Sequence, residues 1–478
     1  MEVAMHSPSL PPTLAESIAE AGQDHVLRFW KTLDESARDR LVGQLAAIDW
    51  GMFGELRRLA RASGPGVVAG VAAALAADLA LANTPPCYVL GDDADRAAAA
   101  GQKGLTQGLF GAVLVAGGQG SRLGCNGPKG VVPVGPLSGA TLFDLLLGRL
   151  RGIAKRYARP VPLAIMTSSA TDADTRAWLA DHDYGGLDPD HLLVFRQRDL
   201  PAVDAAAGNL LLDAPDRIAM APDGHGGMLP ALVAAGGLEW FADRGCRHVT
   251  TFQVDNPLTM PLHPEFLGHH LLDEAEFSTQ VVHKRDPGER VGVVASDGRR
   301  TFVVEYSDLP ASLAAERGPS DRLRFHAGSI AVHAFALDFL RRATAAPDPL
   351  PLHVAHKAVP FLDDTGERVN PRTPNAVKFE RFIFDLMPLA RRVCLVEIDP
   401  AEGFAPLKNP PGAAADTLAH VQAALDAHAR RILHRAGVVV ADGVGVELAP
   451  WILDEADLDA LLSPGSRIER PTVIGSGI

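Results

Sequence analysis

The spacing of apolar residues divides the chain into segments with different periodicities. From Leu14 to about Asp49, apolar residues recur every three or four positions, a pattern that predicts helices. An Ala- and Leu-rich stretch over 66–82 repeats this helical signal until two consecutive prolines interrupt it. The sequence therefore predicts a helical N-terminal region over 1–105.

After residue 105 the pattern changes to strands that alternate with helices. A continuous apolar run over 110–118 ends in glycines and is typical of a strand buried on both faces. Thr141 and Asp144 then form a capping box at the start of a helix with one apolar face. Further strands are predicted over 162–168, 192–197 and 248–256. This alternation over 109–270 predicts an α/β fold with a mainly parallel, doubly wound sheet.

The remainder of the chain predicts two further parts. Short β-like runs over 279–306 indicate an antiparallel part attached to the α/β core. A helical run follows from about residue 415, ahead of a loop-rich tail. A chain of 478 residues is long enough for two or three domains. We expect the helical region over 1–105, a central α/β domain over 106–398 and a smaller C-terminal domain over 399–478.

The composition excludes several classes of protein. Hydrophobic residues make up 47% and charged residues 22%, which is typical of globular proteins and not of disordered chains. With 45 basic and 58 acidic side chains, the net charge is −13, so we expect neither nucleic acid nor a membrane surface as a partner. The four cysteines are widely spaced and no secretory signal is apparent. We therefore expect no disulfide framework and a cytoplasmic location.

The loop after the first predicted strand has the composition of a phosphate-binding site. Residues 114–130 read LVAGGQGSRLGCNGPKG, and their glycines allow backbone amides to turn towards one point. A Rossmann fingerprint is excluded because Leu123 stands where its third glycine is required, and the order around Lys129 is not that of a Walker A loop. Arg122 and Lys129 add two cations. The pattern predicts polyphosphate binding, and the alternative is a tight turn with two solvated cations.

A second candidate is the carboxylate of Asp255, at the end of the strand predicted over 248–256. Ligands bind at the carboxyl edge of a doubly wound sheet, and a hard oxygen ligand there suits Mg²⁺ that holds a phosphate. The alternative is an aspartate that begins the turn before Pro257.

Eight ordered blocks of the sequence resemble the UDP-sugar pyrophosphorylase family, and specifically its eukaryotic-type UDP-N-acetylhexosamine pyrophosphorylases. The resemblance extends from residue 22 to residue 409. The blocks are LVAGGQGSRLG…GPKG (114–130), MAPDGHGGM (220–228), FQVDNPL (252–258), KRDPGERVGVV (284–294), VVEYSDL (303–309), FHAGSIAVH (325–333), NAVKFERFIFD (375–385) and EGFAPLKN (402–409).

The resemblance implies a GT-A-like nucleotidyltransferase as the central domain. Its implied reaction converts UTP and a sugar 1-phosphate into UDP-sugar and pyrophosphate with Mg²⁺. The implied sugar substrate is N-acetylglucosamine 1-phosphate. The alternatives are a UTP–glucose-1-phosphate uridylyltransferase, a broad-specificity UDP-sugar pyrophosphorylase and a non-catalytic nucleotide-sugar sensor.

Matching positions imply the roles of individual residues. Lys129 and Lys408 face the phosphates, and Asp255 binds Mg²⁺. Arg122, from the chemistry of its loop, joins the two lysines as a catalytic cation. The implied nucleotide-binding residues are Gly117, Gly118, Gln197 and Gly224. The expected sugar-binding residues are His225, Gly292, Glu305, His326, Ala327, Gly328, Phe382 and Phe384.

Three residues depart from the pattern of the N-acetylhexosamine members. His225, His326 and Ser329 stand where those members usually have Asn, and a Gly-His-Gly sequence is similar to the UDP-glucose and broad-specificity branches. An Asn amide offers a donor and an acceptor to an acetamido group, whereas a neutral histidine offers both in a different geometry. The departures leave the nucleotide half of the site unchanged and leave the choice of sugar open.

Overall fold

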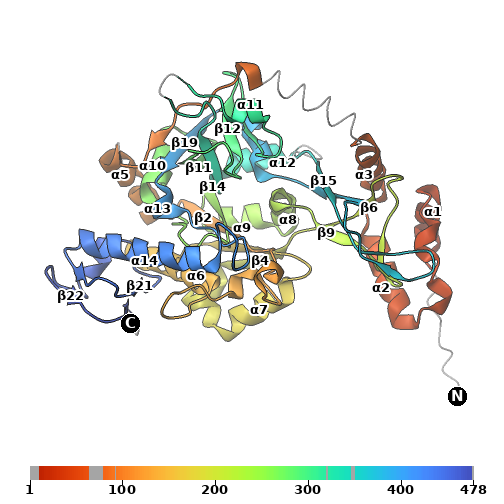
Figure 1. Cartoon of the computed structure of the whole chain (residues 1–478), viewed down its shortest axis with the longest axis horizontal. Coiled ribbons are helices and arrows are strands. Elements are labelled where there is room, and N and C mark those ends of the chain that lie inside the picture. The colour runs from red at the N-terminus through yellow and green to blue at the C-terminus, as the bar shows by residue number, and fades with distance from the viewer. Residues whose placement is uncertain (1–9, 64–78, 92, 319–320, 346–349, 476–478) are drawn as a thin grey trace. The chain divides into compact units, whose positions relative to one another are not determined.

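The computed structural model describes residues 10–63, 79–91, 93–318, 321–345 and 350–475, and Figure 1 shows the whole chain. The chain forms two compact units, each assembled from three stretches of sequence. Unit 1 comprises Met1–Leu75, Arg198–Gly227 and Leu350–Phe382, and unit 2 comprises Ala76–Gln197, Met228–Pro349 and Ile383–Ile478. The helix predicted over 66–82 lies mostly outside the described residues. The division at residues 105 and 398 stays a prediction.

Unit 1 packs helices against small antiparallel sheets. Among its described residues, the α-helices are α1 (Pro12–Glu20), α2 (Glu35–Ala47) and α3 (Trp50–Ala62). Asp34 and Asp49 cap α2 and α3, because their side chains accept hydrogen bonds from the amides of Ala37 and Met52. Between α1 and α2, where the sequence predicts continued helix, the chain forms the short 3-10 helices η1 (Asp24–Leu27) and η2 (Trp30–Thr32).

The strands of unit 1 are short and share one core with these helices. The three-stranded sheet has the order β15 (His353–Lys357), β18 (Ala376–Glu380), β6 (Val203–Asp204). The paired strands are β5 (Asp199–Pro201) with β9 (Met220–Pro222), β7 (Leu212–Ala214) with β8 (Arg217–Ile218), and β16 (Phe361–Leu362) with β17 (Arg368–Val369). Residues of the shared core include Ile18, Leu41, Leu45, Phe53, Leu56, Val203, Leu210, Val377 and Phe379.

Unit 2 is organised around one large mixed sheet (Figure 1). Its strand order is β1 (Tyr88–Val89), β19 (Val393–Ile398), β11 (Phe277–His283), β14 (Ala327–Ala336), β10 (His248–Gln253), β2 (Phe110–Val115), β3 (Leu163–Thr167), β4 (Leu192–Arg196). Strands β10, β2, β3 and β4 are parallel, and β14 runs antiparallel to both of its neighbours. β12 (Val293–Ser296) pairs with β14 and with β13 (Thr301–Val304). The antiparallel strands expected over 279–306 are therefore part of the main sheet.

Helices cover both faces of this sheet. Helix α6 (Leu142–Tyr157) packs its apolar residues against Ala112 and Leu114 of β2. Gly111, which directly precedes Ala112 in β2, faces the other side of the sheet. A Cβ at Gly111 would lie 2.4 Å from the ring of Phe241 in α9 (Gly237–Asp243). Helices on both faces confirm the prediction of an α/β fold with a doubly wound sheet.

Within 109–270, the helices α7 (Asp172–Asp181), α8 (Met228–Ala234) and α10 (Pro264–Leu272) follow the predicted alternation. Outside it, the described residues of unit 2 form α5 (Ala94–Thr106), α11 (Ala311–Ala314), α12 (Leu337–Thr344), α13 (Pro400–Gly403) and α14 (Leu418–Arg435). The predicted capping box is confirmed: the amide of Asp144 donates to Thr141 Oγ1 at 3.1 Å, and the amide of Thr141 donates to Asp144 Oδ2 at 2.8 Å. None of the helices in the described ranges is long and apolar enough to cross a membrane.

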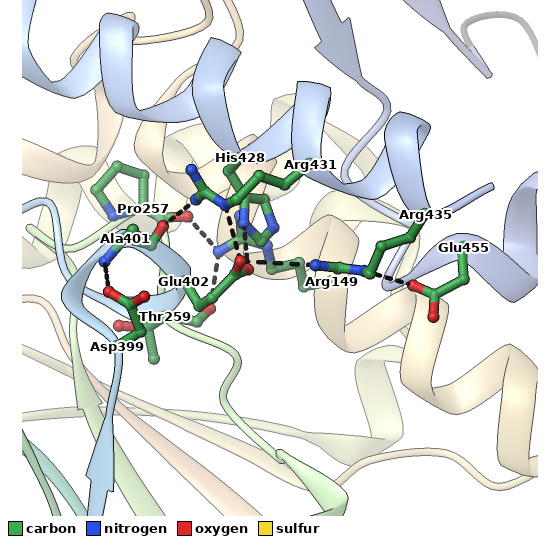
Figure 2. A network of polar contacts seen from close by, with 10 residues as sticks. All are labelled: Arg149, Pro257, Thr259, Asp399, Ala401, Glu402, His428, Arg431, Arg435 and Glu455. Atoms are coloured by element: carbon green, nitrogen blue, oxygen red, sulfur yellow. Dashed lines mark hydrogen bonds and ion pairs between the residues drawn. The ribbon is translucent and has the colours of Figure 1, made fainter. Parts of the chain in front are cut away.

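The C-terminal part of unit 2 adds small two-stranded sheets to α14. They pair β20 (Val439–Val440) with β22 (Arg467–Ile468), and β21 (Val446–Leu448) with β23 (Thr472–Ile474). Glu402 at the end of α13 connects this part to the sheet, as Figure 2 shows: its carboxylate accepts from Arg431 Nε at 2.7 Å and lies 3.1 Å from His428 Nδ1. A cavity of about 620 Å³ adjoins this network.

We expect Glu402→Gln to destabilise the protein at neutral pH and to have little effect at acid pH. The contacts with His428 and Arg431 lower the pKa of Glu402 to about 2. A carboxyl group with a lowered pKa in the folded state stabilises it above the unfolded pKa, near 4.5, and this stabilisation is lost as the pH falls towards 2. Because the side chain is 37% exposed, solvent screening reduces the expected effect to about 1 kcal/mol.

Thermal unfolding of the wild type and the variant at pH 7 and near pH 3 measures this effect. Glu469→Gln is the matched control, because that glutamate is 71% exposed and pairs only with Arg467 among the described contacts. A difference in Tm that stays the same at both pH values would contradict the role given to the Glu402 charge.

Candidate active site at the carboxyl edge of the main sheet

The glycine loop follows β2 and folds back on itself. The amide of Gly120 donates to Gly127 O at 2.9 Å, and the amide of Lys129 donates to Gly118 O at 2.9 Å. Gly124 and Gly127 have φ values of +76° and +136°, which other residues rarely adopt. Arg122 lies on the exposed turn of this loop, in the 3-10 helix η3 (Ser121–Leu123). The loop is thus a tight turn, which both interpretations of the sequence require, and polyphosphate binding stays a prediction.

Lys129 and Asp255 meet at the ends of two adjacent parallel strands. Lys129 begins the 3-10 helix η4 (Lys129–Val131) after the β2 loop, and Asp255 follows β10. Lys129 Nζ lies 3.5 Å from Asp255 Oδ2, and the two side chains are 16% and 22% exposed. A cation and a carboxylate are thus both accessible where ligands bind to this class of sheet.

The segment that carries Lys408 is attached to the same strand end. The amide of Leu407 donates to the carbonyl oxygen of Asp255 at 2.8 Å. The side chain of Asn256 donates to Gly403 O at 2.8 Å and accepts from the amide of Ala405 at 3.0 Å. Lys408 itself is exposed. Asn256 therefore positions the lysine segment beside Asp255, a role that the sequence analysis missed because Asn next to Pro257 is also typical of a turn.

Gln197 and Gly117 lie together at the ends of β4 and β2. A Cβ at Gly117 would lie 2.8 Å from Nε2 of Gln197, so this position accepts only glycine without movement. Gln197 is 5% exposed, and its Oε1 is buried with no hydrogen-bond partner among the described residues. A buried acceptor without a partner is costly unless a ligand supplies the donor. Gly118 beside them is exposed.

Most of the sugar-binding residues predicted in unit 2 are brought together around β12, β13 and β14. A Cβ at Gly292 would lie 3.0 Å from Oε1 of Glu305. Gly328 pairs with Val293, and the amide of Ser329 donates to Gly292 O at 2.8 Å. Ala327 begins β14, and Phe384 lies in the 3-10 helix η8 (Ile383–Leu389), which packs against β13. His326, just before β14, instead lies beside His283 of β11.

The sites predicted in unit 1 form a second cluster. Gly224 has φ +83°, and a Cβ there would lie 2.6 Å from Arg381 O. The rings of His225 and Phe382 stack with centroids 5.3 Å apart, and His353 lies 4.4 Å from the ring of Phe382. Burial, followed by the charge of His353, lowers the pKa of His225 to about 4. His225 is therefore neutral at pH 7.

Asp223 in the same loop is a residue that the sequence analysis missed. Its side chain is fully buried, 3.9 Å from Arg381 Nη1, and its backbone exchanges hydrogen bonds with Arg198 and Arg381. Burial raises the pKa of Asp223 to about 7, against the lowering effect of Arg381. The sequence offered one indication of its importance, because Asp223 lies between Pro222 and Gly224. Asp223 thus helps to shape the loop that presents His225.

The edge of the main sheet has the features of an enzyme that transfers nucleotidyl groups. These strand ends suit a polyphosphate substrate, because they carry a glycine loop, an accessible lysine–aspartate pair and a second lysine. The model of the family described as UTP–glucose-1-phosphate uridylyltransferase matches residues 100–424. The chain belongs to this family of UDP-sugar pyrophosphorylases, which are nucleotidyltransferases. Such enzymes generally use a divalent metal ion.

The relatives and solved structures agree with this assignment. The chain is 36% identical to UDP-N-acetylhexosamine pyrophosphorylase-like protein 1 of Mus musculus, over 90% of this chain and 87% of the relative. It is also 36% identical to UDP-N-acetylglucosamine pyrophosphorylase of Saccharomyces cerevisiae, over 73% of this chain and 75% of the relative. A crystal structure from Entamoeba histolytica, assigned as a UDP-N-acetylglucosamine pyrophosphorylase, is 28% identical with a TM-score of 0.74, covering 82% of this chain and 99% of that one.

Proposed function

We propose that the chain joins UTP to N-acetylglucosamine 1-phosphate and releases pyrophosphate. The observation that carries the proposal is the edge of the main sheet where Lys129, Asp255 and the Lys408 segment meet. The names of the yeast and Arabidopsis thaliana relatives support N-acetylglucosamine as the sugar. A glucose-specific or broad-specificity enzyme is the second candidate, because His225 occupies the Gly-His-Gly loop.

In the proposed reaction, an oxygen of the sugar phosphate attacks the α-phosphorus of UTP. The bond between the α-phosphorus and the bridging oxygen breaks, and pyrophosphate leaves with that oxygen. The attacking phosphate is already an anion at pH 7, so no general base is needed. Lys129 and Lys408 offset negative charge as the two anionic substrates approach in line, with Arg122 available on the exposed loop.

The metal of the proposal is Mg²⁺, with Asp255 as its protein ligand. Mg²⁺ is commonly held by one or two carboxylates together with substrate phosphates, and Asp255 offers one accessible carboxylate beside the glycine loop. The donor chemistry therefore fits. The bound ion would supply positive charge to the phosphates of UTP.

A pyrophosphate-release assay with a panel of nucleotides and sugar 1-phosphates tests the proposal. We expect turnover with UTP to exceed turnover with ATP by more than about a hundredfold, because the buried Oε1 of Gln197 needs a donor and the N3–H of uracil supplies it, while a uracil carbonyl accepts from Nε2. Gln197→Ala should reduce this preference, whereas Gln102→Ala, at an exposed position of α5, should not. Equal turnover with ATP and UTP would contradict the assignment.

We expect His225→Asn to raise the ratio of kcat/KM for N-acetylglucosamine 1-phosphate to that for glucose 1-phosphate. One better-placed hydrogen bond to the acetamido group contributes about 0.5–1.5 kcal/mol, which is a few-fold to roughly tenfold. His434→Asn, at an exposed position of α14, is the matched control. An unchanged ratio would show that His225 does not contact the C2 substituent, and a lower ratio would make His225 itself the acetamido partner.

A cytoplasmic location is also part of the proposal. All four cysteines lie in the described residues, and none forms a disulfide. Unpaired cysteines are typical of proteins in a reducing compartment.

A further inference from the structure

Two histidines and a glutamate gather at the ends of three neighbouring strands of the main sheet. β11 lies between β14 and β19; His283 is its last residue, His326 directly precedes β14, and Glu397 lies on β19. One nitrogen of each histidine and one oxygen of the glutamate all lie within 4.8 Å of one another. In the part of the chain that the structure describes, no other three His, Cys, Asp or Glu side chains meet this condition.

The register of β11 and β19 explains why the side chains of His283 and Glu397 meet. β11 and β19 are parallel, with Val281 opposite Glu397, so these two side chains share a face. His283 is two residues after Val281 and points to the same face. In the antiparallel pair of β11 with β14, His283 lies opposite Ala327, the residue after His326. The sheet thus fixes the backbone positions of His283 and Glu397, and His326 is held just before β14 by the bond from the amide of Lys284 to its carbonyl oxygen at 2.8 Å.

The orientation of His326 is typical of a metal ligand. Its Nδ1 hydrogen-bonds to the carbonyl oxygen of Leu323 at 3.0 Å, so the proton lies on Nδ1 and the lone pair on Nε2. Metal-binding histidines commonly donate their second nitrogen to a backbone carbonyl in this way. The amide of His326 is itself held by Thr84 Oγ1 at 3.2 Å.

His283 presents a nitrogen that no hydrogen bond satisfies. Its Nδ1 is buried, has no hydrogen-bond partner among the described residues, and lies 3.8 Å from Glu397 Oε1, too far for a hydrogen bond. Burial lowers the pKa of His283, with Glu397 acting against this and His326, Arg322 and Arg285 adding to it. A lowered pKa favours the neutral imidazole, which has the lone pair that a metal ion requires. The two arginines will weaken the site, so we expect lower affinity than in structural zinc sites.

We propose that His283, His326 and Glu397 bind a divalent transition-metal ion, with Zn²⁺ as the best match. Two imidazoles and one carboxylate suit Zn²⁺, whereas Mg²⁺ prefers oxygen ligands. Ligand atoms around a tetrahedral zinc ion lie about 3.3 Å apart, so small side-chain rotations bring the present group into range. The three proposed ligands do not include Asp255, and the binding of an ion here is argued from these three side chains alone, without the proposed reaction.

Binding here would join three strands through their side chains. His326 directly precedes Ala327 and Gly328, which the sequence places at the sugar. The ion would therefore fix the start of β14 against β11 and β19.

Equilibrium dialysis of the EDTA-treated full chain against Zn²⁺, with excess Mg²⁺ present, tests the proposal. We expect one Zn²⁺ ion per chain at this site in the wild type, and one fewer in His283→Gln and in Glu397→Gln. His434→Gln, which removes an exposed histidine outside the cluster, should bind as the wild type does. Unchanged stoichiometry in the two cluster variants, or no binding in the wild type, would overturn the proposal.

Two further measurements make the result independent of how well the variants fold. Zn²⁺ should raise the Tm of the wild type and of His434→Gln, since a ligand that binds the folded state stabilises it, and should leave the Tm of folded Glu397→Gln unchanged. X-ray absorption of the one-to-one zinc complex of the wild type should show two imidazole ligands. Fewer than two would overturn the proposal whatever the variants do.

Discussion

Lys129→Ala is expected to lower kcat for UDP-sugar formation by about 10²–10³-fold, the usual loss when one electrostatic contact to a transition state is removed. Lys129 Nζ lies 3.5 Å from the carboxylate of Asp255 and is held at that strand end by the bond from its amide to Gly118. The charge is needed most when the α-phosphate and the leaving pyrophosphate carry the developing charge. The KM for UTP should therefore change less than kcat.

Lys103→Ala provides the matched control for this variant. Lys103 is exposed in the last turn of α5, so its removal should leave both kinetic constants unchanged. The pair of Lys129 with Asp255 is partly exposed and contributes little to stability, so the two variants should unfold at similar temperatures. Wild-type turnover in Lys129→Ala would remove the lysine from the phosphate site.

The strands and the glycine turn after β2 were predictable from the sequence because they depend on local patterns. The apolar run over 110–118 contains β2, and the Thr141–Asp144 capping box begins α6. These signals act over a few residues, where periodicity and capping decide the structure. The ordered motif blocks then indicated the family, which the comparisons confirm.

Features that depend on long-range pairing were not predictable in the same way. The sequence suggested an antiparallel part beside the core, but β11 and β14 lie inside the main sheet, between β10 and β19. Strand order is set by contacts between residues far apart in the chain, which local periodicity does not encode. The meeting of His283, His326 and Glu397 has the same origin, since the two histidines are 43 positions apart in the sequence and His326 is further still from Glu397.

The role of Asn256 was only partly predictable from the sequence. The sequence placed it in the FQVDNPL block, and the alternative there was a turn before Pro257. Both hydrogen bonds of its side chain go to the segment over 403–405, which precedes Lys408 by a few residues. The structure thereby connects two blocks that the sequence presents as independent.

Asp255→Asn is expected to raise the Mg²⁺ concentration needed for half-maximal activity and to lower kcat, again by about 10²-fold or more if one electrostatic partner of the phosphates is lost. The amide of asparagine has nearly the size of the carboxylate but lacks its charge, and Mg²⁺ favours anionic oxygen. The backbone bond from Leu407 to the carbonyl oxygen of residue 255 remains in this variant, so the Lys408 segment stays attached. The substitution therefore removes the charge of the carboxylate and leaves the backbone contact of residue 255 intact.

A Mg²⁺ titration of EDTA-treated wild type, Asp255→Asn and Asp243→Asn measures the effect, with Asp243 as an exposed aspartate at the end of α9. The wild type and the control should be inactive in EDTA and recover with Mg²⁺, whereas Asp255→Asn should recover poorly at any concentration. Because Asp255→Asn also frees Lys129 from its ion pair, an opposing result is informative. If the variant is fully active with an unchanged Mg²⁺ dependence, neither metal binding nor the function of Lys129 depends on this carboxylate, and Asp255 is a strand-end residue that begins a turn.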